Sequence, residues 1–223
     1  MAPRFPPSIG AVLAIVLAAA AAMSGCTTGS RAATLPATAI HDDDIVFPAD
    51  RAPVLAPGAE CTAFTPRMRA AADIPAHAEA TPMEPRHGCW ATSGNVVAIL
   101  TTATPFGDFW RRTYPYDDGS GLTAMTVDKS GAQLFERFIL DSRYYAVRVG
   151  SQWRAGLDSG VTKTACMLAV DTGSAKPLLI TLTQQLPAGA PAVKTVSQQC
   201  TLAATVAHTV LDERDPSGGS HVR

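Results

Sequence analysis

The runs Thr164-Ala-Cys-Met-Leu-Ala-Val170 and Pro177-Leu-Leu-Ile-Thr-Leu-Thr183 flank a short polar stretch, Asp171-Thr-Gly-Ser-Ala-Lys176. The outer runs are apolar and contain β-forming residues, and the stretch between them has the composition of a turn. This pattern predicts two antiparallel strands joined as a hairpin.

The same pattern occurs twice more, earlier in the chain. Residues 87–92 and 95–103 are joined at Ser93-Gly94, and residues 134–140 and 144–149 flank Asp141-Ser-Arg143. Short connections join neighbouring strands in antiparallel sheets, because parallel strands need a long crossover. We therefore expect a mainly antiparallel sheet of about six strands.

Two helices are predicted outside these hairpins. Thr65 and Pro66 fit the N-cap and the first position of a short helix that ends near Asp73. Residues 193–213 place an apolar stripe on one helix face, namely Val196, Cys200, Ala203, Ala207 and Val210. The fold class expected is α+β, with the short N-terminal helix and the long C-terminal helix packed on the sheet.

The N-terminus has the pattern of an export signal. Arg4 precedes an uncharged apolar run that ends in Met23-Ser-Gly-Cys26, which resembles a bacterial lipobox. The run is too short to span a hydrocarbon core of about 30 Å. Residues 1–25 are therefore expected to be a lipoprotein signal peptide and Cys26 the lipidated residue; the alternative is an ordinary cleaved signal.

Composition divides the rest of the chain. Residues 26–58 contain prolines, small residues and the acidic patch His41-Asp-Asp-Asp44, and are expected to form a flexible linker. This patch is interpreted as a solvated charge cluster rather than a cation site. Residues 59–214 are expected to form a single α+β domain, and residues 215–223 a disordered tail.

The chain contains five cysteines, and four remain once Cys26 is set aside: Cys61, Cys89, Cys166 and Cys200. An even number in an exported chain predicts two disulfides. Cys61 and Cys200 lie at or in the predicted helices, whereas Cys89 and Cys166 lie in predicted strands. Pairing helix with helix and strand with strand favours Cys61–Cys200 and Cys89–Cys166. The pairing in sequence order, Cys61–Cys89 with Cys166–Cys200, stays open. A zinc site is the rival, but no Cys-x-x-Cys spacing occurs.

These cysteines and their neighbours carry a resemblance. Cys61 before a Thr-Pro helix, Cys89-Trp90, Cys166 four residues before Val170, and Cys200 three before Ala203 occur in this order. The domain resembles an actinobacterial family of exported lipoproteins described as a domain of unknown function. The resemblance implies an α+β sandwich outside the membrane and transfers no catalytic residue.

The sequence contains little that points to catalysis. Asp118-Gly-Ser-Gly121 lacks the spacing of a nucleophile elbow, the histidines are scattered, and no phosphate-binding loop occurs. No catalytic residue, metal or cofactor is therefore assigned. The net charge of −1 argues against a nucleic-acid partner.

Aromatic and arginine side chains gather at residues 106–116, as they do in many binding hot spots. The candidate binding residues are Phe109, Trp110, Arg111, Arg112, Tyr114 and, in a later loop, Trp153. The alternative is that Phe109 and Trp110 cap the sheet while the arginines are solvated.

The expected function is a non-catalytic binding or accessory protein, lipid-anchored on the extracytoplasmic face of the cell membrane. Its partner would be a small hydrophobic ligand or an envelope protein. The alternatives are an envelope-acting hydrolase and an interaction subunit of a membrane complex.

Overall fold

The structure is a computed structural model. It describes residues 35–83, 87–93, 95–101, 104–117, 122–126, 132–154, 161–187 and 194–220. All of these belong to one compact unit, Ala32–Arg223. No helix within these ranges is long and apolar enough to cross a membrane.

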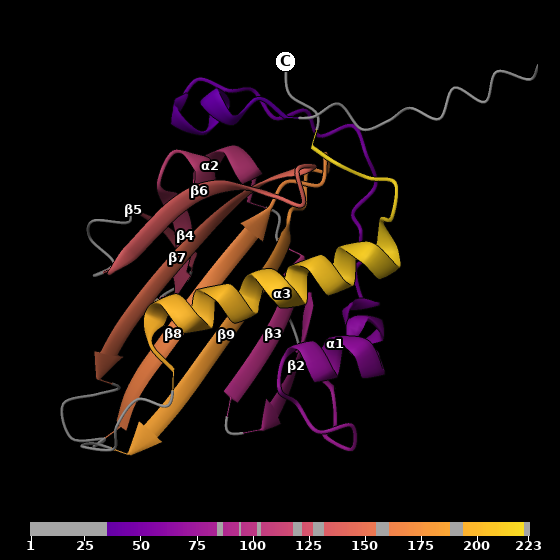
Figure 1. Cartoon of the computed structure of the whole chain (residues 1–223), viewed down its shortest axis with the longest axis vertical. Helices are drawn as coiled ribbons and strands as arrows, with labels where there is room; N and C mark the ends of the chain where they lie inside the picture. The colour runs from indigo at the N-terminus through magenta and orange to yellow at the C-terminus, as the bar shows by residue number, and fades with distance from the viewer. Residues whose placement is uncertain are drawn as a thin grey trace, which may run out of the picture. The chain divides into compact units, whose positions relative to one another are not determined.

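The centre of this unit is a seven-stranded sheet in which every neighbouring pair is antiparallel (Figure 1). Its strands, in sheet order, are β1 (Thr81–Pro82), β2 (Gly88–Ser93), β3 (Asn95–Thr101), β9 (Leu178–Pro187), β8 (Val161–Val170), β7 (Tyr144–Arg154) and β6 (Leu134–Leu140). The predicted α+β class and the three hairpins are confirmed. The main sheet has seven strands rather than six, because the short edge strand β1 carries no apolar pattern that would mark it.

A separate hairpin pairs β4 (Thr113–Asp117) with β5 (Leu122–Thr126). The aromatic stretch before it is helical only in α2 (Phe106–Trp110). The helix stops because Arg112 adopts a left-handed conformation with φ 65°. The residues that follow favour extended backbone, since Thr and Tyr are good strand formers.

The long C-terminal helix, α3 (Val196–Arg214), lies across one face of the sheet (Figure 1). Thr195 accepts a hydrogen bond from the backbone N–H of Gln198, whose side chain in turn accepts one from the N–H of Thr195. This capping box fixes the start of the helix a few residues later than predicted. The predicted short helix is α1 (Pro66–Ala71), preceded by the 3₁₀ turn η2 (Glu60–Ala63).

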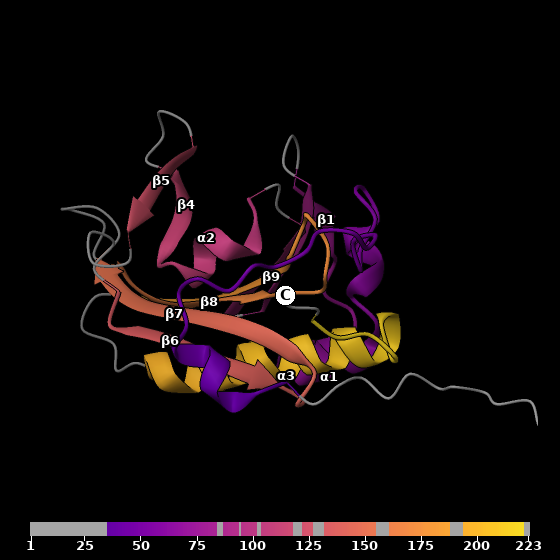
Figure 2. The ribbon, with the colours of Figure 1, turned by 90° about the horizontal axis from the view of Figure 1, so that it is seen from above.

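Apolar side chains are buried on both faces of the sheet. Cys166, Leu168 and Ile180 pack beneath α3, whereas Tyr145, Val147 and Leu179 pack on the opposite face with α2. Figure 2 shows the helices on the two sides, α3 below the sheet and α2 above it. The sheet therefore has two apolar layers, and the second includes residues N-terminal to the expected domain.

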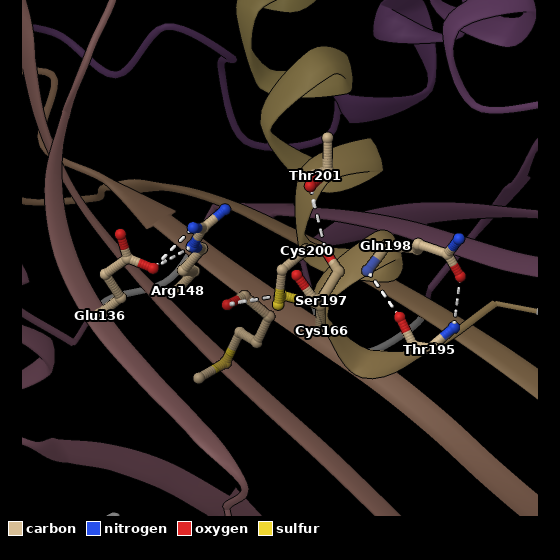
Figure 3. Close-up of a disulfide and its surroundings, with 9 residues drawn as sticks. Glu136, Arg148, Cys166, Thr195, Ser197, Gln198, Cys200 and Thr201 are labelled. Atoms are coloured by element: carbon tan, nitrogen blue, oxygen red, sulfur yellow. Dashed lines mark hydrogen bonds and ion pairs between the residues drawn. A yellow bond between two sulfur atoms is a disulfide. The ribbon is translucent and has the colours of Figure 1, made fainter.

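The four cysteines form two disulfides, as predicted, but the favoured pairing is wrong. Cys61 pairs with Cys89. Cys166 pairs with Cys200, and Figure 3 shows this second disulfide. The strands that carry Cys89 and Cys166 are separated by β3 and β9. Three strand spacings amount to about 14 Å, about twice the Cα–Cα distance that a disulfide can bridge.

Residues 35–58 differ from the expected linker because they pack on the folded unit. Leu35, Ile45 and Leu55 are buried, and η1 (Ala37–His41) forms a 3₁₀ turn. The backbone N–H of Arg51 donates to the carbonyl of Gly173 at 2.9 Å. The first part of the expected linker, residues 26–34 with Cys26, lies outside the described residues.

The C-terminal tail also differs from expectation. Ser220 is buried, and its hydroxyl donates to the carbonyl of Asp171 at 2.9 Å while accepting from the N–H of Tyr145 at 2.8 Å. Arg51 binds Asp215 through Nη2–Oδ1 at 2.7 Å. Residues 215–220 are thus held against the sheet by polar contacts that no local sequence pattern reveals.

Candidate functional site

The predicted binding residues do not form one surface. Phe109 and Trp110 are 1% and 0% exposed, and the indole Nε1 of Trp110 donates to the carbonyl of Asp42 at 2.6 Å. These two side chains belong to the apolar layer above the sheet, which is the alternative that the sequence left open. They are therefore not free to contact a partner.

Arg111 and Arg112 are exposed, as recognition residues must be. The guanidinium of Arg112 lies over the ring of Phe135, 5.1 Å from its centroid. Tyr114 and Trp153 lie in β4 and β7, and their side chains are outside the described part of the structure. Of the six predicted residues, only the two arginines are described as exposed.

An aromatic cluster joins α2 to the segment before Arg51. The ring of Phe47 meets those of Phe106 at 4.7 Å, Trp110 at 5.3 Å and Tyr145 at 6.0 Å, each edge to face. Edge-to-face pairs add stability beyond the area that they bury. The cluster therefore fixes Phe47, although its segment has no helix or strand of its own.

Beside this cluster lies a cavity of about 160 Å³, which we call the Phe47 pocket. Its lining comes from three segments that are far apart in the sequence: Val46, Phe47, Pro48 and Ala49; Pro105, Phe106, Gly107 and Arg111; and Asp171, Ser174 and Ala175. Aromatic and aliphatic walls with a few polar groups are typical of small-molecule sites.

The polar wall of the Phe47 pocket is built by the turn between β8 and β9. Oδ1 of Asp171 accepts the N–H of Gly173 at 2.9 Å, and Gly173 has φ 72°, a conformation that favours glycine. Arg51 forms an isolated parallel bridge with Ser174. The bridge holds the segment of Phe47 along this turn, so that the turn and the aromatic rings share one cavity.

The charges at the Phe47 pocket differ in their exposure. Asp171 is 1% exposed and Ser174 5%, whereas Arg111 is exposed. Behind the turn, the hydrogen bond to Asp215 raises the pKa of Arg51, and Asp171 adds to the rise. Asp171 belongs to the lining of the pocket, whereas Arg51 and Asp215 do not.

Two buried hydroxyls belong to neighbours of the lining residues: Thr172 follows Asp171 in the turn, and the ring of Tyr145 packs against that of Phe47. Oγ1 of Thr172 and the phenolic oxygen of Tyr145 have no hydrogen-bond partner among the described residues. Burial raises the pKa of the Tyr145 phenol, which keeps it neutral. Unsatisfied polar atoms are uncommon in protein interiors, so their presence here sets this region apart from the rest of the core.

A second, shallower recess of about 360 Å³ lies beside Arg112, between η1 and β6. Three of its charged lining groups form ion pairs, Arg137 with Asp43 and Glu136 with Arg148 at 2.6 Å, and Arg112, which also lines it, lies over the ring of Phe135. The Arg137 guanidinium lowers the pKa of the Asp43 carboxyl by hydrogen bonding to it.

A third recess, also about 360 Å³, lies at the start of α3. The capping box of Thr195 and Gln198 accepts hydrogen bonds from backbone N–H groups at this end of the helix. Nζ of Lys194 pairs with Asp73 at 3.0 Å. Thr195 and Lys194 in its lining are therefore engaged in holding the start of α3 in place.

His208 on α3 lies between two carboxylates. Nδ1 of His208 lies 2.7 Å from Oδ2 of Asp141, and Nε2 lies 3.6 Å from Oδ2 of Asp212. Both ring nitrogens face carboxylates, so the cluster ties α3 to the turn before β7. Within the described ranges no group of three metal-ligating side chains is found, and residues 118–121 lie outside them.

The Phe47 pocket could not be predicted from the sequence, because two of the three segments that line the pocket have no helical or strand periodicity. Val46 to Ala49 belong to the stretch expected as a linker, and Asp171 to Ala175 to a turn. The one available signal is the short apolar run Ile45-Val-Phe47 before Pro48, which stands between the acidic patch and a polar stretch.

Comparison of the chain with protein-family models, with curated proteins and with solved structures finds no match.

Proposed function

We propose that the protein is a lipid-anchored binding protein of the cell envelope, which takes up a small ligand in the Phe47 pocket. The apolar N-terminal run that ends in Cys26 supports export and anchoring. The two disulfides support an oxidising, extracytoplasmic location, because such bonds persist outside the cytoplasm.

The observation that carries the binding role is the Phe47 pocket. It joins two aromatic rings, a buried carboxylate and an exposed guanidinium around one small cavity. Such a pocket orients a ligand by its polar groups and holds it by its apolar walls. Binding without reaction fits this set, because the described side chains that line it include no histidine or cysteine.

The anchor is tested by the variant Cys26→Ala. We expect the wild-type protein in the membrane fraction of the producing cell and the variant in the soluble exported fraction, because one acyl chain or none does not anchor stably. Mass spectrometry of the wild-type N-terminal peptide should show the added lipid. Unchanged fractionation of the variant would rule out Cys26 as the anchor.

Ligand binding is tested by native mass spectrometry of the protein purified from its producing cell. Ala175 is exposed at the rim of the pocket, so Ala175→Trp should fill the cavity and leave the fold intact. The matched control is Ala56→Trp, also exposed but away from the pocket. We expect a small bound mass in the wild type and the control that is absent from Ala175→Trp. A bound mass that persists in Ala175→Trp contradicts the assignment.

A further inference from the structure

We infer that the Phe47 pocket takes a small carboxylate with a short apolar tail, such as a branched monocarboxylate of about five carbon atoms. The inference rests on the proposed binding function and adds the chemical class of the ligand. Two donors on the lining bind the carboxylate, the apolar walls bind the tail, and the volume of the cavity limits the length of the tail.

The volume of the cavity fits a molecule of this size. The cavity measures about 160 Å³, and a protein cavity of about 150 Å³ lined by apolar side chains encloses one benzene molecule. Sites for drug-sized ligands start at about 300 Å³. The Phe47 pocket therefore has room for a short branched tail, whereas a long acyl chain is too large to be enclosed.

Most of the lining is apolar. The rings of Phe47 and Phe106 meet edge to face, with their centroids 4.7 Å apart. Val46, Pro105 and Ala175 line the same cavity. Val46 is 57% exposed and is the one large hydrophobic side chain found exposed among the described residues. A ligand tail placed against these side chains removes apolar surface from water, which stabilises the complex.

Arg111 supplies a cation at the mouth of the cavity. Its side chain is exposed, and its Nη1 lies 3.0 Å from where a Cβ of Gly107 would be, so the guanidinium lies against α2. Among the described residues this guanidinium has no ion pair or hydrogen bond. The pKa of Asp43 is lowered mainly by its hydrogen bond to Arg137 and least by the charge of Arg111. The planar donors of Arg111 match a carboxylate, which they can bind through two parallel hydrogen bonds.

Ser174 supplies a second donor, on the buried side of the cavity. The residue is 5% exposed, and its Oγ accepts the backbone N–H of Lys176 at 3.1 Å. A hydroxyl also donates one hydrogen bond, and within the described part of the chain the Ser174 hydroxyl has no acceptor. A ligand oxygen between Ser174 and Arg111 can therefore accept from both.

Asp171 also lines the cavity, but it is engaged in the structure by other groups. Its Oδ1 accepts the N–H of Gly173 at 2.9 Å. The pKa of Arg51 is raised first by its hydrogen bond to Asp215 and further by the charge of Asp171, so Asp171 and this guanidinium attract each other. No ligand group is therefore placed on Asp171. Arg111 is the one cation among the lining residues, and it decides the charge of the ligand.

Four related probes test the assignment: 3-methylbutanoate, its neutral amide, 3-methylbutylamine with an ammonium in place of the carboxylate, and acetate without the branched tail. Calorimetric titration of the full mature chain in detergent, in a buffer free of carboxylates, should show binding of 3-methylbutanoate. The amide should bind about threefold to tenfold more weakly, because an exposed charge pair contributes modestly. The amine should bind at least about tenfold more weakly, because its charge repels Arg111. Acetate should also bind at least about tenfold more weakly, since each buried methylene group changes the affinity about fourfold.

The variants assign each contact. Arg111→Gln should weaken 3-methylbutanoate to the level of the amide and leave the amide unchanged, a pattern that a general loss of structure would not give. Ser174→Ala should weaken the acid and the amide alike, by about threefold to tenfold, because both present an oxygen to the hydroxyl. Ala175→Trp should abolish binding of both, and Ala56→Trp should change neither. Should Ser174→Ala fail to fold, the Arg111→Gln comparison still decides.

The inference is overturned if the amide, the amine or acetate binds as tightly as 3-methylbutanoate. It is also overturned if Ala175→Trp retains binding of 3-methylbutanoate, or if the wild type does not bind this probe at about 10 mM. Failure here is distinguishable from failure of the proposed function. A co-purified mass that Ala175→Trp removes would keep the binding function while excluding the carboxylate class.

Discussion

At the scale of single residues, the missing side chain of Gly150 allows α3 to pack closely on the sheet. It pairs with Cys166 in the sheet, and a Cβ on it would lie 2.2 Å from Cγ1 of Val196 and 3.3 Å from Cβ of Leu134. The sequence predicts a strand that ends at residue 149, just before this glycine. In the structure β7 continues to Arg154, and the glycine serves the close approach of α3.

The variant Gly150→Ala should lower the free energy of unfolding by about 1–3 kcal/mol, because an added methyl group overpacks the contact with α3. Urea denaturation measures the loss. The double variant Gly150→Ala/Val196→Ala should recover part of it, since the nearest clashing atom is removed. A single variant as stable as the wild type, or a double variant without recovery, would contradict this account.

At the scale of elements, local pairings were predictable and long-range ones were not. Each of the three hairpins could be inferred because apolar strands and turn residues are adjacent in the sequence. The disulfide partners could not, since they depend on sheet order: β9 inserts between β3 and β8 only in the folded chain. The Phe47 pocket could not be predicted for the same reason, because its segments meet through a backbone bridge and ring contacts that form only in the folded chain.

The two disulfides close loops of similar length, with separations of 28 and 34 residues. In a loop-closure model, removing either should cost about 4 kcal/mol. We expect Cys61→Ala/Cys89→Ala and Cys166→Ala/Cys200→Ala to lose similar amounts in denaturant titrations.

Hydrogen exchange separates the two variants. Loss of Cys166–Cys200 should speed exchange in α3, which this bond fastens to β8, whereas loss of Cys61–Cys89 should act on η2 and β2. Equal exchange profiles in the two variants would show that the bonds do not stabilise separate elements. Non-reduced peptide mapping of the wild type verifies the pairing.

At the scale of the whole molecule, a network of polar contacts, which we call the polar clasp, joins Arg51 and Tyr144 to Asp215 and Gly219. Arg51 binds Asp215 at 2.7 Å and donates to the carbonyl of Gly219 at 3.2 Å. The hydroxyl of Tyr144 reaches Oδ2 of Asp215 at 3.1 Å and its carbonyl at 2.9 Å. The clasp extends the folded unit beyond both boundaries that composition suggested.

The clasp predicts an alkaline dependence of stability. Burial, reinforced by Asp215, raises the pKa of Tyr144 above its usual value of about 10. A raised pKa means that folding favours the neutral phenol, so its contribution is complete below about pH 10 and is lost as the pH rises beyond it. The free energy of unfolding of the wild type should therefore fall above this pH.

The variant Tyr144→Phe should be about 1–2 kcal/mol less stable at neutral pH, because the bonds to Asp215 are lost. Its stability should also decline less steeply above about pH 10, with the remaining slope including that of Tyr145, whose pKa burial also raises. Denaturant titrations at a series of pH values measure both effects. Parallel pH profiles for variant and wild type would exclude Tyr144 as the titrating group.

The packing of residues 35–58 also limits how far the protein can act from a bilayer. Under the proposed anchor, eight residues (27–34) separate Cys26 from Leu35, and eight residues span at most about 30 Å in any conformation. A linker running to residue 58 would have allowed a several-fold longer reach. The Phe47 pocket would then sample only the layer of the envelope next to the membrane, and would meet ligands arriving at or leaving that surface.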